Sequence, residues 1–358
     1  MNEAVAEQEK VSTLPASLEQ IITDILGTIE REREREIVAR RFGLFDRKET
    51  LEQIGELLGI TRERVRQLEK AVVARLKSVA YEDLPHVAAI EKEFVKHLEA
   101  MGNAARISDL TAKISPNVSK IDQSRISFLA QLSPSLSVIE DSDHFHHSVG
   151  IAKVHDEKTI KGNVDKIIAA VKEIGEPTTI DKIQAITKHE NPQHIAALAS
   201  TSKNLATLNG RWGLVKWPMV NPKNIRDKIY VILHDAGRHM HFNEIAEAIK
   251  GSSFKRKDVT TQAIHNELIK DKRFVLIGRG IYALKEWGYQ KGTVADIIAE
   301  ILRKEGGPLH RDEIVKRVLK SRFVKETTIL LNLQGKPQFK RVAKATYTLA
   351  EPAAKAAK

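Results

Sequence analysis

Apolar residues in this chain recur mainly at intervals of three and four, the spacing of amphipathic helices. The first such run spans residues 17–42 and predicts helix, with Ile21, Ile25 and Ile29 among its apolar positions. Glu and Arg alternate over residues 30–36 of this run. On a helix, that alternation places opposite charges three apart and like charges four apart, so its net stabilisation is small. The charged stretch therefore predicts a solvent-exposed helix face.

Two short helices joined by a glycine are predicted from Thr50 to Lys77. Thr50 and Gln53 have the spacing of a capping box. Gly59 is expected to end the first helix, because glycine adopts the left-handed conformation without strain. Thr61 is expected to cap the second. The predicted core positions are Ile54, Leu57 and Leu58 in the first helix and Val65, Leu68, Val72 and Leu76 in the second. This arrangement is typical of a helix-turn-helix.

The polar face of the second helix is mostly basic. Its N-terminal end is the part that contacts base edges in such motifs. Arg can bond guanine, Glu can accept from cytosine and Gln can pair with adenine. The candidate base-contacting residues are therefore Arg62, Glu63, Arg66 and Gln67. The alternative is an ordinary charged surface helix with ion pairs four residues apart.

This segment resembles region 4 of the primary bacterial sigma factors, which recognises the promoter −35 element. The matching text is RFGL at 41–44, TLEQIGELLGI at 50–60 and TRERVRQLE at 61–69, and the resemblance covers about residues 30–77. It implies that Arg62, Glu63, Arg66 and Gln67 face −35-type bases and that Thr61 and Arg64 support phosphate contacts. It also implies an apolar surface on the first helix for the β-subunit flap of RNA polymerase core.

Sigma factors melt the −10 element with an aromatic-rich helical region, whereas residues 1–30 contain no Phe, Trp or Tyr. A regulator or a polymerase-associated protein is therefore expected in place of a complete initiating sigma factor.

The rest of the chain is repetitive, with a unit of about 60–70 residues. Gly102, Gly175, Gly237 and Gly306 each follow an amphipathic run, and an apolar residue stands eight positions after each: Leu110, Ile183, Ile245 and Ile314. An aromatic–small–Leu element recurs at Trp212, Tyr282 and Tyr347, where the rings are expected to support a hairpin from its apolar side. The pattern of each unit predicts a helix, a short strand, two further helices and a β-hairpin. This is the order of elements in a winged helix.

The predicted fold is therefore mainly α with small β-hairpins, an α+β arrangement of a helix-turn-helix followed by tandem winged helices. The predicted segments are a helical lead at 1–29, the helix-turn-helix at 30–80, winged helices at 86–152, 158–219, 221–289 and 291–350, and a tail at 351–358. The first winged helix has the weakest pattern, with its hairpin expected at 144–151. The unit at 221–288 resembles the HARE-type winged-helix family, which includes the N-terminal domain of the RNA polymerase delta subunit. That resemblance implies a role with nucleic acid or the transcription machinery.

The formal net charge is +11, which favours a polyanionic partner. Residues 221–358 hold 28 Lys or Arg against 15 Asp or Glu, so the excess lies in the last third. Such clusters bind phosphate without sequence preference. The candidate backbone-contacting residues there are Lys255, Arg256, Lys257, Arg279, Lys340, Arg341 and Lys344, and further basic residues lie at Lys316, Arg317, Lys320, Arg322, Lys325 and Lys336. A basic surface that only keeps the protein soluble is the alternative.

No cysteine is present, which excludes disulfides, thiolate metal sites and cysteine nucleophiles. Two groups of residues are candidate ligands for a divalent metal. The cluster at 141–147 is expected in a solvated wing loop, and His239 with His241 is expected beside a strand. No P-loop, G-x-S-x-G or HExxH motif occurs. The sequence thus predicts no metal, no cofactor, no small-molecule substrate and no enzymatic activity. No secretory signal or membrane-spanning run is found, so a cytoplasmic protein at the nucleoid is expected.

These patterns together predict a transcription regulator that binds double-stranded DNA, the polymerase flap, or both. A sequence-blind architectural DNA-binding protein is one alternative. The DNA-binding component of a restriction or defence system is another.

Overall fold

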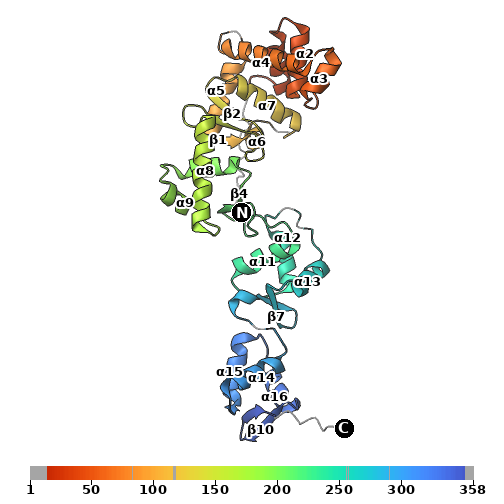
Figure 1. The fold of residues 1–358 in the computed structure, drawn as a ribbon, viewed down its shortest axis with the longest axis vertical. Helices are drawn as coiled ribbons and strands as arrows, with labels where there is room; N and C mark the ends of the chain where they lie inside the picture. Colours follow the sequence, from red (N-terminus) through yellow and green to blue (C-terminus); the bar gives the residue numbers. More distant parts are fainter. Residues whose placement is uncertain are drawn as a thin grey trace, which may run out of the picture. The chain divides into compact units, whose positions relative to one another are not determined.

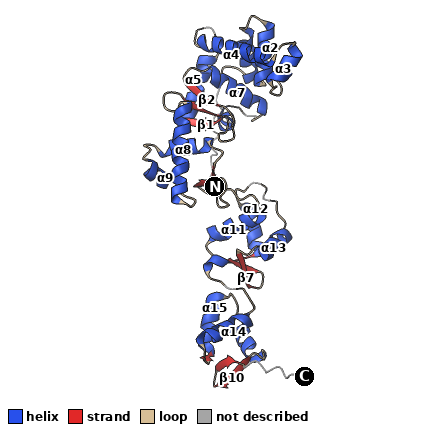
Figure 2. Ribbon diagram, in the orientation of Figure 1, coloured by secondary structure: helices blue, strands red, loops and turns tan. Residues whose placement is uncertain are grey.

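The computed structural model describes residues 14–82, 84–115, 118–254, 256, 258–289 and 291–350. The chain divides into two compact units, Met1–Lys216 and Trp217–Lys358. Helices predominate in both, with small antiparallel sheets between them (Figure 2). Each unit is described by itself below.

The first unit begins with four helices: α1 (Leu18–Gly27), α2 (Glu32–Phe42), α3 (Leu51–Leu58) and α4 (Arg62–Ser78). The expected single helix over 17–42 is wrong, because it breaks between α1 and α2. Thr28 caps α1, and Arg31 has an extended backbone before α2. Ile29 is nevertheless fully buried within the break. The break therefore lets both helices turn their apolar faces into one core.

Two blocks follow in the first unit. One comprises α5 (Val87–Ala100), β1 (Ala104–Arg106), α6 (Ile107–Ile114), α7 (Lys120–Leu132), β2 (Leu136–Ile139) and β3 (Ser148–Ile151). The other comprises α8 (Glu157–Ile174), α9 (Ile180–Thr187), α10 (Pro192–Thr201), β4 (Leu205–Leu208) and β5 (Arg211–Leu214).

The second unit contains two further blocks with the same order of elements. The first has α11 (Ile225–Ala236), β6 (Met240–His241), α12 (Phe242–Gly251), α13 (Thr261–Lys270), β7 (Phe274–Gly278) and β8 (Ile281–Leu284), followed by a short 3-10 helix (Lys285–Trp287). The second has α14 (Val294–Glu305), β9 (Leu309–His310), α15 (Arg311–Ser321), α16 (Glu326–Gly335), β10 (Phe339–Ala343) and β11 (Thr346–Leu349). Figure 1 shows each block as a helical group beside a hairpin.

The four blocks share one strand topology. In three of them the last strand pairs with both others, giving the orders β1-β3-β2, β6-β8-β7 and β9-β11-β10. In the remaining block the first strand is reduced to a single bridge between Thr178 and Trp212. Trp212, Tyr282 and Tyr347 occupy the central strands of their blocks, and all three rings are buried.

The glycine and apolar positions of the repeat have matching places in the structure. Leu110, Ile183, Ile245 and Ile314 are each the fourth residue of the second helix in their block, and each is fully buried. Gly102, Gly175, Gly237 and Gly306 have φ of 90°, 76°, 62° and 70° after the first helix. This backbone conformation is one that glycine adopts without a steric penalty. The repeat thus reflects one local chain path used four times.

The hairpin of the first block differs from the expected one at 144–151. Only Ser148–Ile151 forms a strand there, and its partner is Leu136–Ile139. The loop between them packs on the next block: Phe145 bridges Ser202, and the His146 N–H donates to the Thr201 carbonyl at 2.8 Å. The expectation of a solvated loop therefore holds for residues 141–144, which are exposed, and is wrong for Phe145 and His146.

Helix α7 is buried along most of its length, unlike the third helices of the second unit. Its buried residues are Arg125, Ile126, Ser127, Phe128, Leu129, Ala130 and Leu132, whereas α13 buries Ile264 and Leu268 and α16 buries Ile329 and Leu333. Residues of α1, α2, α4 and α7 belong to one apolar core, which includes Ile22, Val38, Val72 and Phe128. Helices α1, α2 and α4 are thus packed on the first block through α7.

Candidate nucleic-acid interface

The turn between α3 and α4 has the expected geometry. Thr50 and Gln53 form a capping box at the start of α3. Gly59 ends that helix with φ 65°, and the Thr61 hydroxyl accepts from the Arg64 N–H at 3.2 Å. The backbone is close inside the turn, since a Cβ on Gly55 would lie 2.7 Å from the Ile60 carbonyl oxygen. These contacts fix the direction in which α4 leaves the turn.

A small apolar cluster holds the two helices together. Ile37, Ile54 and Val65 are fully buried in it, and the partly buried residues around them are Leu51, Leu58, Ile60 and Leu68. The expected apolar face of α3 is only partly right, because Leu57 is 54% exposed. Leu57 therefore lies at the solvent-exposed edge of the apolar face of α3.

The four candidate base-contacting residues lie together on the exposed N-terminal end of α4. Arg66 donates to Glu63 through two bonds, Nε to Oε2 at 2.8 Å and a terminal nitrogen to Oε1 at 2.6 Å. Gln67 also donates to Glu63, at 3.4 Å. Arg62 has no partner among the residues that the structure describes. Glu63 thus holds two of the candidate residues in place on the free surface.

This network has a consistent electrostatic effect. The hydrogen bonds from Arg66 lower the pKa of Glu63, and the carboxylate of Glu63 raises the pKa of Arg66. Both groups are therefore charged at neutral pH. Arg64, expected to support phosphate contacts, donates to Gln67 at 3.4 Å and is otherwise exposed.

The charged stretch at 30–36 is not simply a solvated face. Glu34 is buried at 6% exposure and accepts from Arg75 of α4 at 2.8 Å. That bond is the first cause of the lowered pKa of Glu34. Arg33 donates to the Leu58 carbonyl at the end of α3. The prediction of a solvent-exposed face is therefore wrong for Glu34, whereas Arg33 is exposed as predicted. Together the two residues join α2 to both helices of the motif.

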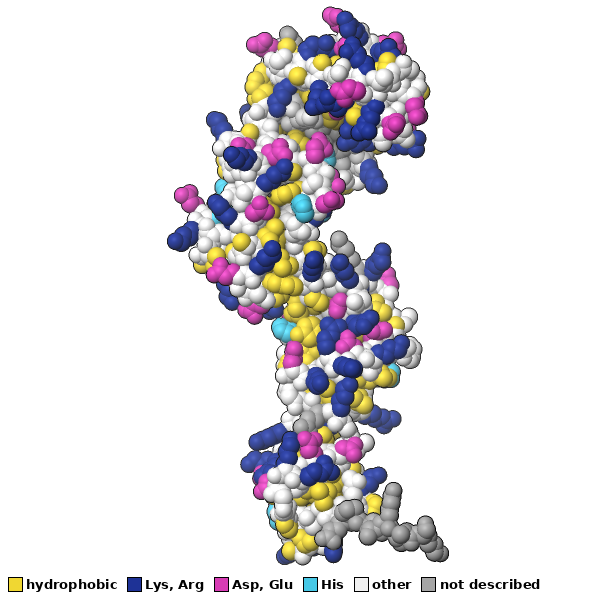
Figure 3. All heavy atoms as spheres, viewed as in Figure 1, with side chains coloured by type: hydrophobic (Ala, Val, Ile, Leu, Met, Phe, Trp, Pro, Cys, Tyr) yellow, Lys and Arg dark blue, Asp and Glu magenta, His cyan; other side chains and the backbone are white. Residues whose placement is uncertain are grey.

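The candidate backbone-contacting residues that the structure describes in the second unit lie in three places. Lys340, Arg341 and Lys344 lie on the exposed outer side of β10 and its turn, and Arg279 lies in the turn between β7 and β8. Arg256 is exposed, with φ 56°, and its carbonyl accepts from the buried Lys228. Lys255 and Lys257 lie outside the described residues. Figure 3 shows Lys and Arg side chains over much of the visible face of this unit.

Two basic residues expected in that surface have other surroundings. Arg317 forms ion pairs with Glu305 and Glu313, at 2.8 and 2.7 Å. Arg322 is buried at 7% exposure, and its terminal nitrogens donate to the carbonyls of Leu276 and Gly292. A free phosphate-contacting role for Arg322 on the protein surface is therefore wrong. Lys316, Lys320 and Lys336 are exposed.

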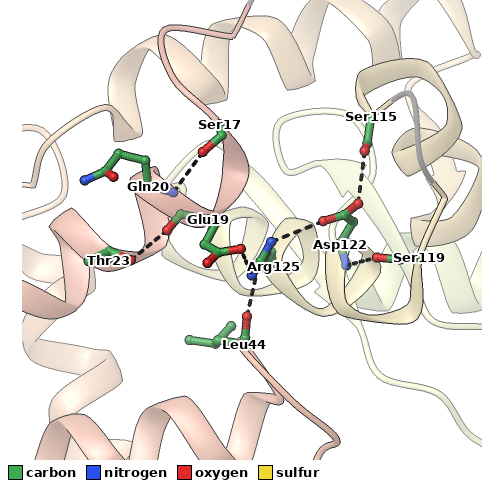
Figure 4. Close-up of polar contacts among 9 residues, drawn as sticks. All are labelled: Ser17, Glu19, Gln20, Thr23, Leu44, Ser115, Ser119, Asp122 and Arg125. Atoms are coloured by element: carbon green, nitrogen blue, oxygen red, sulfur yellow. Dashed lines mark hydrogen bonds and ion pairs between the residues drawn. The ribbon is translucent and has the colours of Figure 1, made fainter.

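Sequence reasoning also missed Arg125, which fixes the helix-turn-helix on the first block. Its guanidinium donates to the Leu44 carbonyl at 2.8 Å and to Glu19 of α1 at 2.9 Å, and it pairs with Asp122 at 3.4 Å (Figure 4). No local pattern indicates such a role, because the main partners are distant in sequence. An arginine within the otherwise apolar end of α7 was the one available signal.

Three histidines of the second block form a further cluster that the sequence did not indicate. The rings of His155 and His194 are 5.2 Å apart, and those of His189 and His194 are 5.8 Å apart. They line a cavity of about 390 Å³. Burial, with the charges of His194 and His189, lowers the pKa of His155 to about 4. Across the described residues, no group of three His, Asp or Glu has an arrangement able to hold a metal ion.

Residues 31–78 match the family model of Sigma-70, region 4. Similar proteins include the RNA polymerase sigma factor sigB of Arabidopsis thaliana, 35% identical over 85 residues, and the RNA polymerase sigma factor SigA of a Bacillus species, 35% identical over 82 residues. The RNA polymerase principal sigma factor HrdD of Streptomyces griseus is 38% identical over 80 residues.

Each of these matches covers 22% of this chain, and 14%, 22% and 23% of the respective relative. The likeness is therefore confined to the helix-turn-helix. It identifies α2–α4 as a DNA-binding helix-turn-helix of the sigma region 4 type and supports a DNA-binding role connected with transcription.

None of the helices in the described ranges is both long enough and apolar enough to cross a membrane.

Proposed function

We propose that this protein is a DNA-binding transcription factor that recognises promoter DNA of the −35 type through α4. The main support is the match of residues 31–78 to Sigma-70, region 4, in a segment whose α4 exposes its N-terminal end. In this proposal Arg62, Glu63, Arg66 and Gln67 contact bases, and Thr61 and Arg64 contact phosphates. The protein acts by binding and carries out no catalysis.

The four blocks are proposed to be winged helices that add binding surfaces to the helix-turn-helix. Their order of elements and strand topology support this assignment. Lys340, Arg341 and Lys344 lie exposed on the last hairpin, and Arg279 lies on the preceding one, so these residues are proposed to hold the DNA backbone. Joining several weak sites in one chain raises the overall affinity through effective concentration.

RNA polymerase core is the second proposed partner, bound through its β-subunit flap. The exposed apolar side chain of Leu57 on α3 supports this part of the proposal. Leu57→Lys should weaken capture of core polymerase and leave duplex binding and thermal unfolding unchanged. A variant that captures polymerase as the parent does would argue against contact through α3.

Selection of bound duplexes from a random pool, with and without core polymerase, tests the main proposal. A −35-like sequence should be enriched by the parent protein. Arg66→Ala should abolish that enrichment, whereas Lys340→Ala should lower affinity for all duplexes alike. A pool that stays random with the parent protein would contradict promoter recognition.

The second candidate is a sequence-blind architectural protein, favoured by the 28 basic residues in 221–358. It predicts that Arg66→Ala and Lys340→Ala weaken duplex binding equally, and that added salt weakens binding to all sequences alike.

A further inference from the structure

A cavity of about 1080 Å³ lies within the second unit, where the β7–β8 hairpin meets the starts of α14 and α16. The hairpin contributes Leu276 and Arg279, the end of α15 contributes Leu319, and the following segment contributes Arg322, Phe323 and Lys325. The Phe323 N–H donates to the Ile277 carbonyl at 3.0 Å, so this segment runs along β7. The cavity walls are therefore held by backbone contacts between the two blocks.

Arg322 brings a buried positive charge to the cavity wall. It is 7% exposed, and its terminal nitrogens donate to the carbonyls of Leu276 and Gly292. Its Nε has no hydrogen-bond partner in the described part of the chain. No carboxylate of the described residues forms an ion pair with it, and Asp296, which faces it, accepts from the Thr293 N–H at 2.7 Å.

A buried charge of this kind is costly unless an opposite charge or hydrogen bonds compensate for it. Burial accordingly lowers the pKa of Arg322. The two carbonyls and the nearby charge of Asp296 compensate for part of this cost, and an anion in the cavity would accept from the unpartnered Nε.

Two further features favour an anion at the same place. Arg279 and Lys325 line the cavity and carry positive charges at its rim. Helix α16 begins beside it, with Lys325 at the N-cap and no side-chain cap bond. An uncapped helix N-terminus attracts phosphate because its free amides point at the ligand.

Three large apolar side chains of the lining are open to solvent. Leu276, Leu319 and Phe323 are 49%, 45% and 56% exposed, and the Phe323 ring lies 4.6 Å from that of His239. An inorganic anion alone would leave these surfaces uncovered. A ligand with a flat or apolar body attached to its phosphate would cover them and could stack on Phe323.

We propose that this cavity binds a nucleotide, with its phosphate beside Arg322, Arg279 and Lys325 and its base against Leu319 and Phe323. The same chemistry is available from a free nucleotide or from a nucleotide of bound DNA. The inference is independent of promoter recognition by α4, since it rests on residues of the second unit alone.

Calorimetric titration of the full chain tests the proposal, with ATP, inorganic phosphate and a short duplex as separate probes. The cavity variant is Arg279→Ala with Lys325→Ala. The matched control is Lys316→Ala with Lys320→Ala, which removes two charges from α15 outside the cavity. Circular dichroism checks that both variants remain folded.

ATP binding should be at least tenfold weaker in the cavity variant than in the control. Phe323→Ala should weaken the binding of ATP but not that of inorganic phosphate. Because Arg279 is also proposed to hold the DNA backbone, the duplex is compared in Phe323→Ala. Weaker duplex binding by Phe323→Ala, with no change for ATP, would identify DNA as the source of the nucleotide. Equal behaviour of the cavity variant and the control with both ATP and duplex overturns the proposal. Phosphate binding as tightly as ATP overturns the assignment of a nucleotide.

Discussion

The Nε of Arg125 donates to the carbonyl oxygen of Leu44 across 2.8 Å, joining α7 of the first block to the loop that follows α2. Leu44 is fully buried, and the Arg125 side chain is 10% exposed. The helix-turn-helix is thus held on the first block by a buried charged hydrogen bond as well as by apolar packing. A rigid connection of this kind would determine the angle at which α4 meets DNA.

Replacing Arg125 by Ala should destabilise the first unit by about 3 kcal/mol, because a hydrogen bond from a charged group is lost and Asp122 loses its ion pair, keeping only the bond from the Ser115 hydroxyl. The Asp122 side chain is 14% exposed, so water solvates its negative charge poorly. Chemical denaturation of the full chain would measure the change.

Glu19→Ala is the control for this variant. Glu19 also pairs with Arg125, but its side chain is 65% exposed, so its removal should cost less than about 1 kcal/mol. Equal losses in the two variants would mean that the Leu44 contact contributes little.

Gly43 and Gly59 provide a matched pair of backbone positions, since both have φ 65°. A Cβ on Gly43 would lie 2.8 Å from the Lys48 nitrogen, whereas a Cβ on Gly59 would meet nothing within 4 Å. Alanine at either position carries the cost of a left-handed conformation, about 1–2 kcal/mol. Gly43→Ala should cost a further 1–3 kcal/mol, roughly the range for overpacking.

Thermal unfolding of the two variants compares these costs. The midpoint for Gly43→Ala should be the lower of the two. If the two midpoints coincide, the 46–48 turn moves aside without cost.

The repeated features of the chain were predictable from sequence because they arise locally. A helix that ends at a glycine and continues into the next helix along the same path places a buried apolar residue eight positions later. The structure therefore agrees with the prediction at Gly237 and Ile245. The turn at Gly59 and the cap at Thr61 were predictable for the same reason. The local sequence was also sufficient to locate the exposed N-terminal end of α4.

Features that depend on distant partners were not predictable. Arg125 and Arg322 bind backbone carbonyls remote in sequence, and a carbonyl carries no residue identity for a motif to detect. Leu57 has the spacing of a core residue, yet it is 54% exposed and lies outside the cluster that Ile54 and Leu58 form with α4. The break near Ile29 falls in a stretch whose apolar spacing alone is compatible with one continuous helix.

The first unit should lose stability as the pH falls below about 6.5, because His155 is buried in its neutral form. Its pKa is lowered from 6.5 to about 4, first by burial and then by the charges of His194 and His189. Between these values the unfolded chain binds a proton that the folded chain does not, so stability decreases with falling pH. The full shift corresponds to about 3 kcal/mol.

Denaturation at pH 7.5 and pH 4.5 measures this dependence. His155→Gln should reduce the difference in unfolding free energy between the two values, whereas His144→Gln, at an exposed position, should leave it unchanged. An unaltered difference in the His155 variant would assign the dependence to other groups.

Removal of the Glu63 carboxylate should change how α4 binds DNA. In the free protein Glu63 holds Arg66 through two bonds, at 2.8 and 2.6 Å, and accepts from Gln67. Glu63→Gln releases the Arg66 guanidinium, which can then contact phosphate at any sequence.

Affinity for unrelated duplexes should rise, and the salt dependence of binding should steepen by about 0.9 for one added phosphate contact. Discrimination between sequences should fall, because a neutral glutamine accepts from cytosine more weakly than a carboxylate does and can also donate to other bases. Glu69→Gln is the control, since it removes the same charge from α4 but its carboxylate pairs with Arg41 at 3.2 Å. Fluorescence anisotropy over a salt series, with a −35-type duplex and an unrelated one, compares the variants. Identical salt slopes in the two would show that net charge, and not the release of Arg66, governs the change.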